Sequence, residues 1–288
     1  MKTTQSKWIF LIVLSLIWGS SFILIKKGLV GLSPFQLGSL RIIFAATFLL
    51  IIGFKSLTKI KQHQWKFIAL TAFMGTFFPA YLFSIAQKHI DSSINAILNS
   101  LTPLGTLVIG ALIFGLSFQR RQFFGVIIGL CGSALLILNG AANHPGQNYW
   151  FAILSIIAAM CYAVNVNLIK KYLSDLSPLS ITAGNFAVLL LPAIIILSST
   201  DFFNVVHLPE VKTSMLFVGI LAIMGTCVAN ILYFRLIQIS SPIFASSVTY
   251  MLPLVACFWG ILDGESLTLV QGFGALVVLL GVYLSARK

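Results

Sequence analysis

Residues 24–34 of this chain read LIKKGLVGLSP, and residues 168–178 read LIKKYLSDLSP. The shared pattern is LIKKxLxxLSP, and the second copy follows the first by 144 residues, half of the 288-residue chain. Each copy ends one apolar run and precedes another. A unit duplicated in a strongly apolar chain is typical of membrane transporters built from two repeats.

Composition indicates that lipid surrounds most of this chain. Hydrophobic residues make up 59% of it and charged residues 8%, too few charges for a water-soluble surface. The net charge of +12 comes from basic residues in short clusters between apolar runs. This distribution is a topology signal, and it argues against a nucleic-acid partner.

The apolar runs are long enough to cross a bilayer, which takes about 20 residues in a helix. Short linkers separate them and leave no room for a soluble domain. We therefore expect an all-α polytopic membrane protein with ten transmembrane helices, at about residues 8–26, 35–54, 66–87, 92–115, 122–139, 149–170, 179–199, 212–234, 242–262 and 268–286.

The basic residues also predict orientation. With the N-terminus inside, 13 of the 18 lysines and arginines fall on the cytoplasmic side and 4 on the outer side, while Arg41 lies within a span. Cytoplasmic loops carry the excess of positive charge. We therefore expect a multi-pass protein of the cell membrane with both termini in the cytoplasm.

The polar segment 139–148, NGAANHPGQN, separates five expected helices from five others. We place the repeat boundary there, with residues 1–141 as the first repeat and residues 142–288 as the second. Because five is odd, the second copy enters the membrane from the opposite side. The copies are therefore expected to be inverted repeats, related by a pseudo-twofold axis in the membrane plane.

Pro103 and Pro253 fall near the middle of the fourth and ninth expected helices. A proline in a helix removes the hydrogen bond to the carbonyl four residues back, here Asn99 or Thr249, and kinks the helix. Matched breaks in two repeats point to a central binding site. We expect these prolines to act as hinges, and a role in packing alone is the alternative.

Polar and aromatic side chains within the expected spans are candidates for binding a small amphiphilic solute, because such groups face the protein interior rather than lipid. Hydrogen bonding between helices is the competing explanation for each of them. The candidate substrate-binding residues are Trp18, Ser21, Tyr81, Asn95, Asn99, Tyr162, Asn165, Asn230 and Tyr250.

Charged residues are scarce inside the expected spans. Arg41 is the one charge well inside a span, and its place six residues into the second helix favours a role in bracing the helix end. Asp, Glu and His are missing from all the span centres, and Glu265 comes closest, with Leu116 as its counterpart in the first repeat. Proton coupling is therefore left open.

A membrane-embedded enzyme is the less favoured class. Hydrolysis or group transfer needs a nucleophile with a base, or metal ligands at a fixed spacing. The four histidines are scattered over loops, and the four cysteines fall inside spans without short spacings between them. We therefore expect no metal, no cofactor and no catalytic site.

The first span carries WGSSF at residues 18–22, followed by Lys26, and this resembles the signature of EamA-type transporters. These form the ten-helix branch of the drug/metabolite transporter superfamily. Arg41 in the second span and GES at residues 264–266 also resemble the family pattern. The second repeat departs from it at Cys161-Tyr162, in place of Trp-Gly, and at Asn185, in place of arginine.

The resemblance covers the whole chain and implies a carrier of the bacterial inner membrane that moves small metabolites, most often exporting amino acids or related compounds. It also implies a central cavity lined by the first, third, fourth, sixth, eighth and ninth helices, and the inverted duplication itself favours alternating access. Uptake of a small nutrient is the alternative to export. The choice between a monomer and a dimer is left open.

Overall fold

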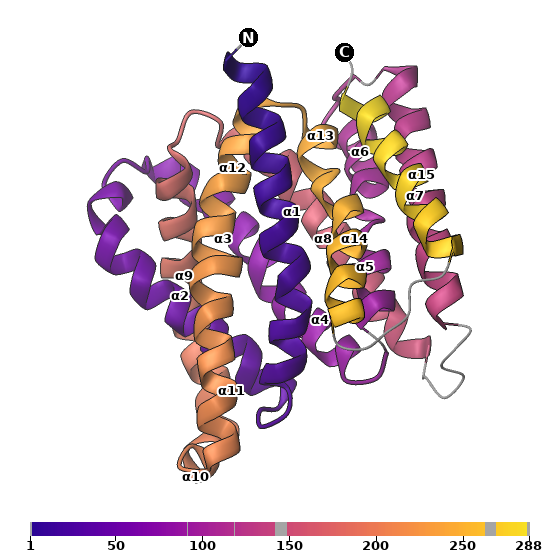
Figure 1. The fold of residues 1–288 in the computed structure, drawn as a ribbon. Coiled ribbons are helices and arrows are strands. Elements are labelled where there is room, and N and C mark those ends of the chain that lie inside the picture. Colours follow the sequence, from indigo (N-terminus) through magenta and orange to yellow (C-terminus); the bar gives the residue numbers. More distant parts are fainter. Residues whose placement is uncertain (1, 91, 118, 142–148, 263–268, 287–288) are drawn as a thin grey trace.

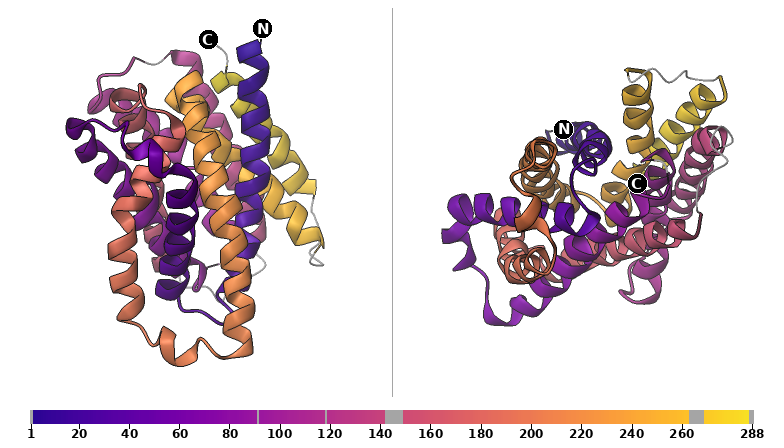
Figure 2. Two further views of the ribbon diagram at one scale, coloured as in Figure 1. Left: turned by 90° about the vertical axis from the view of Figure 1, so that its left-hand side faces the viewer. Right: turned by 90° about the horizontal axis from the view of Figure 1, so that it is seen from below.

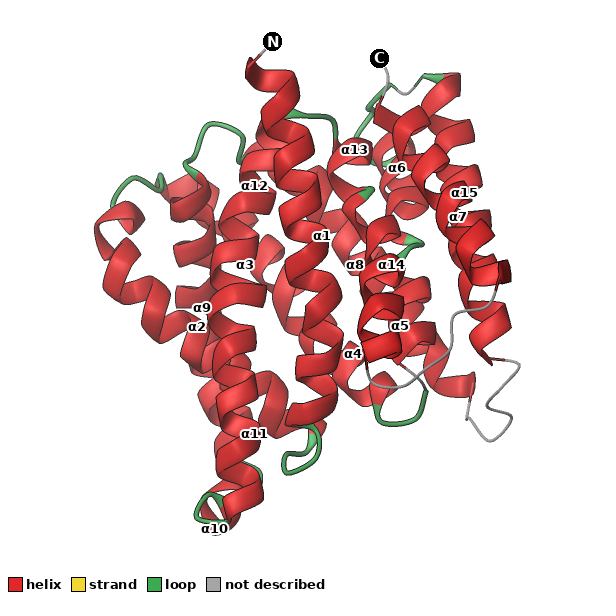
Figure 3. Ribbon diagram, in the orientation of Figure 1, coloured by secondary structure: helices red, strands yellow, loops and turns green. Residues whose placement is uncertain are grey.

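The computed structural model describes residues 2–90, 92–117, 119–141, 149–262 and 269–286. Regular structure within these ranges is entirely helical, without a β-strand, so the expected all-α class is confirmed. The helices form one bundle, and the start of the first helix lies at the same end as the end of the last (Figures 1 and 3). Glu265 and residues 142–148 of the polar linker lie outside the described ranges.

Each copy of the repeated motif ends one long helix and starts the next. The helices that end in it are α1 (Lys2–Gly28) and α8 (Ala152–Tyr172). The helices that begin at its proline are α2 (Pro34–Leu57) and α9 (Pro178–Ser198). The duplicated sequence thus produces the same helix–turn–helix connection twice.

The serine of each copy is the N-cap of the helix that follows. Ser33 Oγ accepts a hydrogen bond from the backbone N–H of Gln36 at 3.3 Å, and Ser177 Oγ accepts one from that of Ser180 at 3.1 Å. These bonds satisfy N–H groups that lack an intrahelical partner. Proline suits the next position because its missing N–H would have no partner there and its φ is already helical.

Lys170 of the second copy caps the neighbouring helix α12 (Ala229–Ile239). Its Nζ donates to the carbonyl oxygens of Ile237, Gln238 and Ser240 at 3.0, 3.2 and 2.8 Å. Carbonyls at a helix C-terminus lack intrahelical donors, and the helix dipole also favours a cation there. The motif lysine therefore fixes how α8 meets α12.

The other elements connect and extend these helices. In chain order they are η1 (Gln62–Gln64), α3 (Trp65–Ala72), η2 (Phe73–Phe77), α4 (Phe78–Gln87), α5 (Ser92–Asn99), α6 (Thr102–Leu112), α7 (Arg120–Ala141), η3 (Tyr149–Phe151), α10 (Phe202–Val205), α11 (Pro209–Ile220), η4 (Leu221–Val228), α13 (Pro242–Ser246), α14 (Val248–Leu262) and α15 (Leu269–Ala286).

Six stretches in the described part of the chain are long and apolar enough to cross a membrane, so the protein is a multi-pass membrane protein. Shorter apolar helices accompany them at residues 102–112, 242–256 and 272–281. The six long stretches are Gln5–Gly28, Pro34–Leu57, Gln62–Gln87, Ala152–Tyr172, Pro178–Ser198 and Pro209–Ile239.

The fourth and ninth expected helices are both interrupted, but at different distances from their prolines. α5 ends at Asn99 and α6 begins at Thr102, which places Pro103 in the first turn of α6. The second break falls between α13 and α14, at Ser247, and α14 continues through Pro253. Pro103 therefore lies beside a break in its helix, whereas Pro253 lies within a continuous helix.

Two π-helical segments, η2 and η4, interrupt the long helical stretches 62–87 and 209–239. Each contains a Gly-Thr pair, Gly75-Thr76 in η2 and Gly225-Thr226 in η4, and the pairs are 150 residues apart. Extra residues in a π-helical turn weaken the regular backbone bonding, and such turns are frequent at functional sites. These segments were not expected from the sequence.

Helices α2 and α9 pack antiparallel along the bundle (Figure 2). Gln36, at the start of α2, donates from Nε2 to Asp201 Oδ1 at 2.7 Å, just beyond the end of α9. Gln64, beyond the end of α2, donates from Nε2 to both oxygens of Asp175 at 3.1 and 3.0 Å, just before α9. The two helices that follow the repeated motif therefore run in opposite directions.

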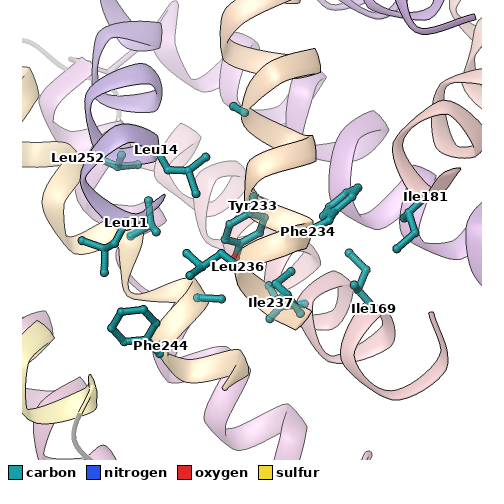
Figure 4. Packing of buried hydrophobic residues seen from close by; sticks show 14 of the residues in the cluster. Leu11, Leu14, Ile169, Ile181, Tyr233, Phe234, Leu236, Ile237, Phe244 and Leu252 are labelled. Carbon is teal, nitrogen blue, oxygen red and sulfur yellow. The ribbon is translucent and has the colours of Figure 1, made fainter. Parts of the chain in front are cut away.

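Apolar side chains of α1, α8, α9, α12, α13 and α14 fill the interior of the bundle (Figure 4). Within a bilayer, close van der Waals packing holds such helices together, because lipid is as apolar as leucine. α7 and α15 approach closely enough that a Cβ on Gly132 or Gly281 would collide with the opposite backbone. The labelled residues of the interior are Leu11, Leu14, Ile169, Ile181, Tyr233, Phe234, Leu236, Ile237, Phe244 and Leu252.

The charge bias predicts that the end of the bundle where α1 begins faces the cytoplasm. Lys59 follows the end of α2 and Asn204 follows the end of α9, so their exposed side chains lie at opposite ends. With the four native cysteines replaced by alanine, an impermeant thiol reagent should label Asn204→Cys in intact cells. It should label Lys59→Cys only after permeabilisation. Labelling of both from one side would contradict the orientation.

Candidate functional site

A cavity lies in the middle of the bundle, between helices from both halves of the sequence. It contains about 870 Å³ of space free of protein atoms, part of it open to solvent. Its walls combine aromatic rings, hydroxyl groups, side-chain amides and one guanidinium, that of Arg41. The aromatic lining residues are Trp18, Phe22, Phe83, Tyr162, Tyr233 and Phe234, and the neutral polar ones are Ser21, Thr76, Asn99, Thr102, Asn165, Thr226, Asn230 and Thr249.

Six of the nine candidate residues from the sequence line this cavity. They come from α1, α5, α8 and α12, which places side chains from both halves around one space. Their combination of flat apolar rings and hydrogen-bonding groups suits a small solute with an apolar body and a polar end. These six are Trp18, Ser21, Asn99, Tyr162, Asn165 and Asn230.

The remaining three candidates lie outside this cavity, so the expectation that they face it is corrected. The Tyr81 hydroxyl is 2.9 Å from Ser39 Oγ, which links α4 to α2. The Tyr250 hydroxyl donates to the carbonyl of Val126 at 3.1 Å, which links α14 to α7. Both side chains are buried and satisfied by a neighbouring helix, as the alternative of interhelical hydrogen bonding predicts.

Asn95 is the third of these residues and is fully bonded between helices. Its Nδ2 donates to the carbonyl of Phe83 at 3.0 Å, and its Oδ1 accepts from Ser155 Oγ at 2.6 Å. Asn99 lies one turn further along α5, on the same face, and lines the cavity. Two asparagines on the same face of α5, one turn apart, therefore have different surroundings: Asn95 is bonded to neighbouring helices, and Asn99 lines the cavity.

Arg41 does not brace the end of α2, so that expectation from the sequence is wrong. The side chain is half-buried and lines the cavity, and Nε donates to Thr226 Oγ1 at 2.8 Å. Thr226 lies in the π-helical segment η4, and its hydroxyl also donates to the carbonyl of Leu221 at 3.3 Å. The long arginine side chain therefore carries its charge from α2 across to η4.

Two aromatic pairs occupy related positions in the cavity wall. Trp18 packs edge-on against Tyr233 with ring centroids 4.8 Å apart, and Tyr162 stacks with Phe83 at 5.8 Å. With the 144-residue separation of the LIKK motif, Tyr162 rather than Cys161 is the counterpart of Trp18, and Tyr233 follows Phe83 by 150 residues. The LIKK copies are also 144 residues apart, and the Gly-Thr pairs are also 150 residues apart. Trp18 therefore corresponds to Tyr162, and Phe83 corresponds to Tyr233.

The π-helical segments receive matching side chains from the opposite half of the sequence. Ser21 packs against Gly225 and Asn165 packs against Gly75, so closely that a Cβ on either glycine would collide with the facing side chain. Trp18 Nε1 also donates to the carbonyl of Gly225 at 2.9 Å. The indole N–H of Trp18 therefore bonds to a backbone acceptor of η4 within the membrane-spanning part of the bundle.

The carbonyls expected to lose their helical donors are satisfied by hydroxyl groups. Asn99 O accepts from Thr102 Oγ1 at 2.7 Å within the same broken stretch. Thr249 O, four residues before Pro253, accepts from Ser100 Oγ of α5–α6 at 3.2 Å. The second bond joins the two interrupted helices directly beside the cavity.

Sequence reasoning missed several lining residues, chiefly Phe83, Tyr233 and Thr76. Phe83 and Tyr233 occur among many aromatic residues with no polar pattern to distinguish them. The separation of 150 residues that relates the Gly-Thr pairs also relates Phe83 to Tyr233, so it is the signal that could have found them. Thr76 belongs to one of those pairs.

The two asparagines of α5 offer a matched test. Asn95→Ala should lower the stability of the purified protein, because Ser155 and the Phe83 carbonyl lose their partner, at a cost of about 1–3 kcal/mol. Asn99→Ala should leave the unfolding temperature near wild type and reduce solute transport. Thermal unfolding in detergent and transport in vesicles measure the two effects. The same loss of stability in both variants would contradict this division.

Comparison with known proteins agrees with the architecture. The model of the EamA-like transporter family matches residues 6–138 and again residues 149–287. The uncharacterized inner membrane transporter YedA of Escherichia coli (strain K12) is 28% identical over 96% of this chain and 92% of its own. A protein named probable amino-acid metabolite efflux pump, from Salmonella typhimurium (strain LT2), is 24% identical over 93% and 91%.

A solved crystal structure shares the fold. It has a TM-score of 0.76 and 14% sequence identity, with 97% of this chain and 96% of that chain covered. The family match spans most of the sequence, and the relatives are transporters of the drug/metabolite type rather than enzymes. The expected membership of the EamA family is thereby confirmed. This chain belongs to the EamA-like transporter family and is a membrane transporter.

Proposed function

We propose that this protein exports a small metabolite, an amino acid or a related compound, across the bacterial inner membrane by alternating access. The observation that carries the proposal is a cavity lined by aromatic and polar side chains from both halves of the sequence. The substrate class follows the name of the Salmonella relative, and the location follows that of YedA. The six cavity-lining candidates form the proposed substrate site.

We propose ten membrane helices arranged as two inverted repeats, residues 1–141 and residues 142–288. Three observations support this: the repeated motif starts both α2 and α9, these helices run antiparallel, and the family model matches twice. A duplicated unit whose equivalent helices run in opposite directions has an inverted topology. With this arrangement the charge bias puts both termini in the cytoplasm.

The aromatic pairs support alternating access between the two sides of the membrane. An inverted repeat converts a contact near one membrane face into an equivalent contact near the other. Trp18–Tyr233 and Tyr162–Phe83 are related in this way by sequence position. Opening of one pair while the other stays closed would expose the cavity to one side at a time.

Metabolite profiling tests the proposed export. A strain that lacks the protein should retain a small polar metabolite that a strain overproducing the protein releases into the medium. Everted vesicles, whose cytoplasmic face is outside, should accumulate that metabolite, while vesicles of native orientation should not. An Asn99→Ala protein present at normal level should reduce the accumulation. Accumulation only in vesicles of native orientation would contradict export and support uptake.

The prolines are the proposed hinges between the two access states. Pro103→Ala would let α5 continue into α6, and Pro253→Ala would give the Thr249 carbonyl a helical donor in place of Ser100. Because the repeats are inverted, each variant should favour a different access state. Distances between spin labels across the two mouths of the cavity measure this. A shift of both variants toward the same state, or of neither, would show that the prolines serve packing alone.

A further inference from the structure

We propose that Arg41 binds a carboxylate of the transported solute, an inference that rests on the transport function proposed above. Arg41 is the one charged side chain among the described residues that line the cavity. It forms no ion pair with any carboxylate in the described part of the chain. A cation in a membrane-embedded, half-buried position is costly unless an anion accompanies it.

The hydrogen bonds of Arg41 leave the end of its guanidinium group available. The Nε–H is bonded to Thr226 Oγ1 at 2.8 Å, and Thr226 is itself held by its bond to the Leu221 carbonyl. The guanidinium carries five N–H donors in a fixed plane, so four remain on the two terminal nitrogens. Two parallel N–H groups of the guanidinium match the two oxygens of a carboxylate. A neutral hydroxyl or amide on the solute would match them less well.

A second lining residue also lacks a partner. Asn165 is 3% exposed, and its Oδ1 forms no hydrogen bond within the described residues. A buried amide oxygen without a donor is destabilising. The Asn165 oxygen is itself covered, so the charged donor that the cavity offers to a solute is the guanidinium of Arg41, and the aromatic rings of the lining suit an apolar body.

The charge is supplied by one half of the sequence only. Asn185 occupies the position in α9 that corresponds to Arg41 in α2, 144 residues later. It is buried, and its side-chain amide is bonded to Thr71 Oγ1 at 2.9 Å rather than lining the cavity. The carboxylate would therefore bind on the α2 side of the cavity, next to η4. The solute would then have a single orientation, although the two repeats build similar cavity walls.

Ligand-dependent unfolding of the purified full-length protein tests the proposal. The probes are pairs that differ only in charge at one end: 3-phenylpropanoate with 3-phenylpropanamide, and L-leucine and L-phenylalanine with their amides. The acids should raise the unfolding temperature and bind about tenfold or more tightly than the amides. Arg41→Gln should abolish this preference. Arg235→Gln, the same change at an exposed arginine outside the cavity, should keep it.

Two further variants separate a binding role from a structural one. Arg41→Lys should retain part of the preference for acids, because the charge remains while the planar pair of donors is lost. Thr226→Val should weaken acid binding without removing the preference, because the guanidinium loses its anchor. Equal binding of acids and amides, no acid binding by the wild type, or an unchanged preference in Arg41→Gln would each overturn the proposal.

Two other results concern the source of the anion and the proposed function. Inorganic phosphate that stabilises the wild type more than any acid, and does so only with Arg41 present, would overturn the carboxylate assignment. The binding measurement does not depend on transport. Acid-selective binding without metabolite release would therefore defeat the export proposal alone, whereas release of a metabolite without Arg41-dependent acid binding would defeat this one alone.

Discussion

The structure depends on one constraint: every backbone polar group at membrane depth needs a partner within the protein. Regular helices meet it without help. At η4, between α5 and α6 and around Pro253, side chains also bond to backbone carbonyls. Trp18 serves the Gly225 carbonyl, Thr102 the Asn99 carbonyl and Ser100 the Thr249 carbonyl. The breaks lie beside the cavity, where polar side chains are available.

Duplication explains why the cavity has two similar walls. The same separations, 144 and 150 residues, relate the LIKK motif, the Gly-Thr pairs of the π-helical segments and the aromatic pairs. Local interactions follow the repeat closely, because Ser33 and Ser177 cap equivalent helices in the same way. Because the two repeats share one structure, they provide two equivalent aromatic contacts, Trp18–Tyr233 and Tyr162–Phe83. These two contacts are the physical basis of the proposed alternating access.

The two repeats differ at residues that determine which chemical groups line the cavity. Arg41 reaches the cavity, whereas its counterpart Asn185 is bonded between α9 and α3. Trp18 donates to a carbonyl of η4, whereas Tyr162 stacks with Phe83. Packing positions can stay alike in both copies because both must bury apolar surface. A binding site for an asymmetric solute gains orientation from a charge on one side only.

The sequence alone determined the membrane class, the helical content, the repeated motif that precedes α2 and α9, and six of the residues around the cavity. It could not separate Asn95 from Asn99, because helix periodicity places both on one face. It also could not locate the π-helical segments or the break at Ser247, since these depend on partners from distant helices. Only the tertiary structure decided which polar groups are paired by neighbouring helices, as Asn95 is, and which line the cavity, as Asn99 and Arg41 do, because hydrogen bonding between helices is a property of their packing.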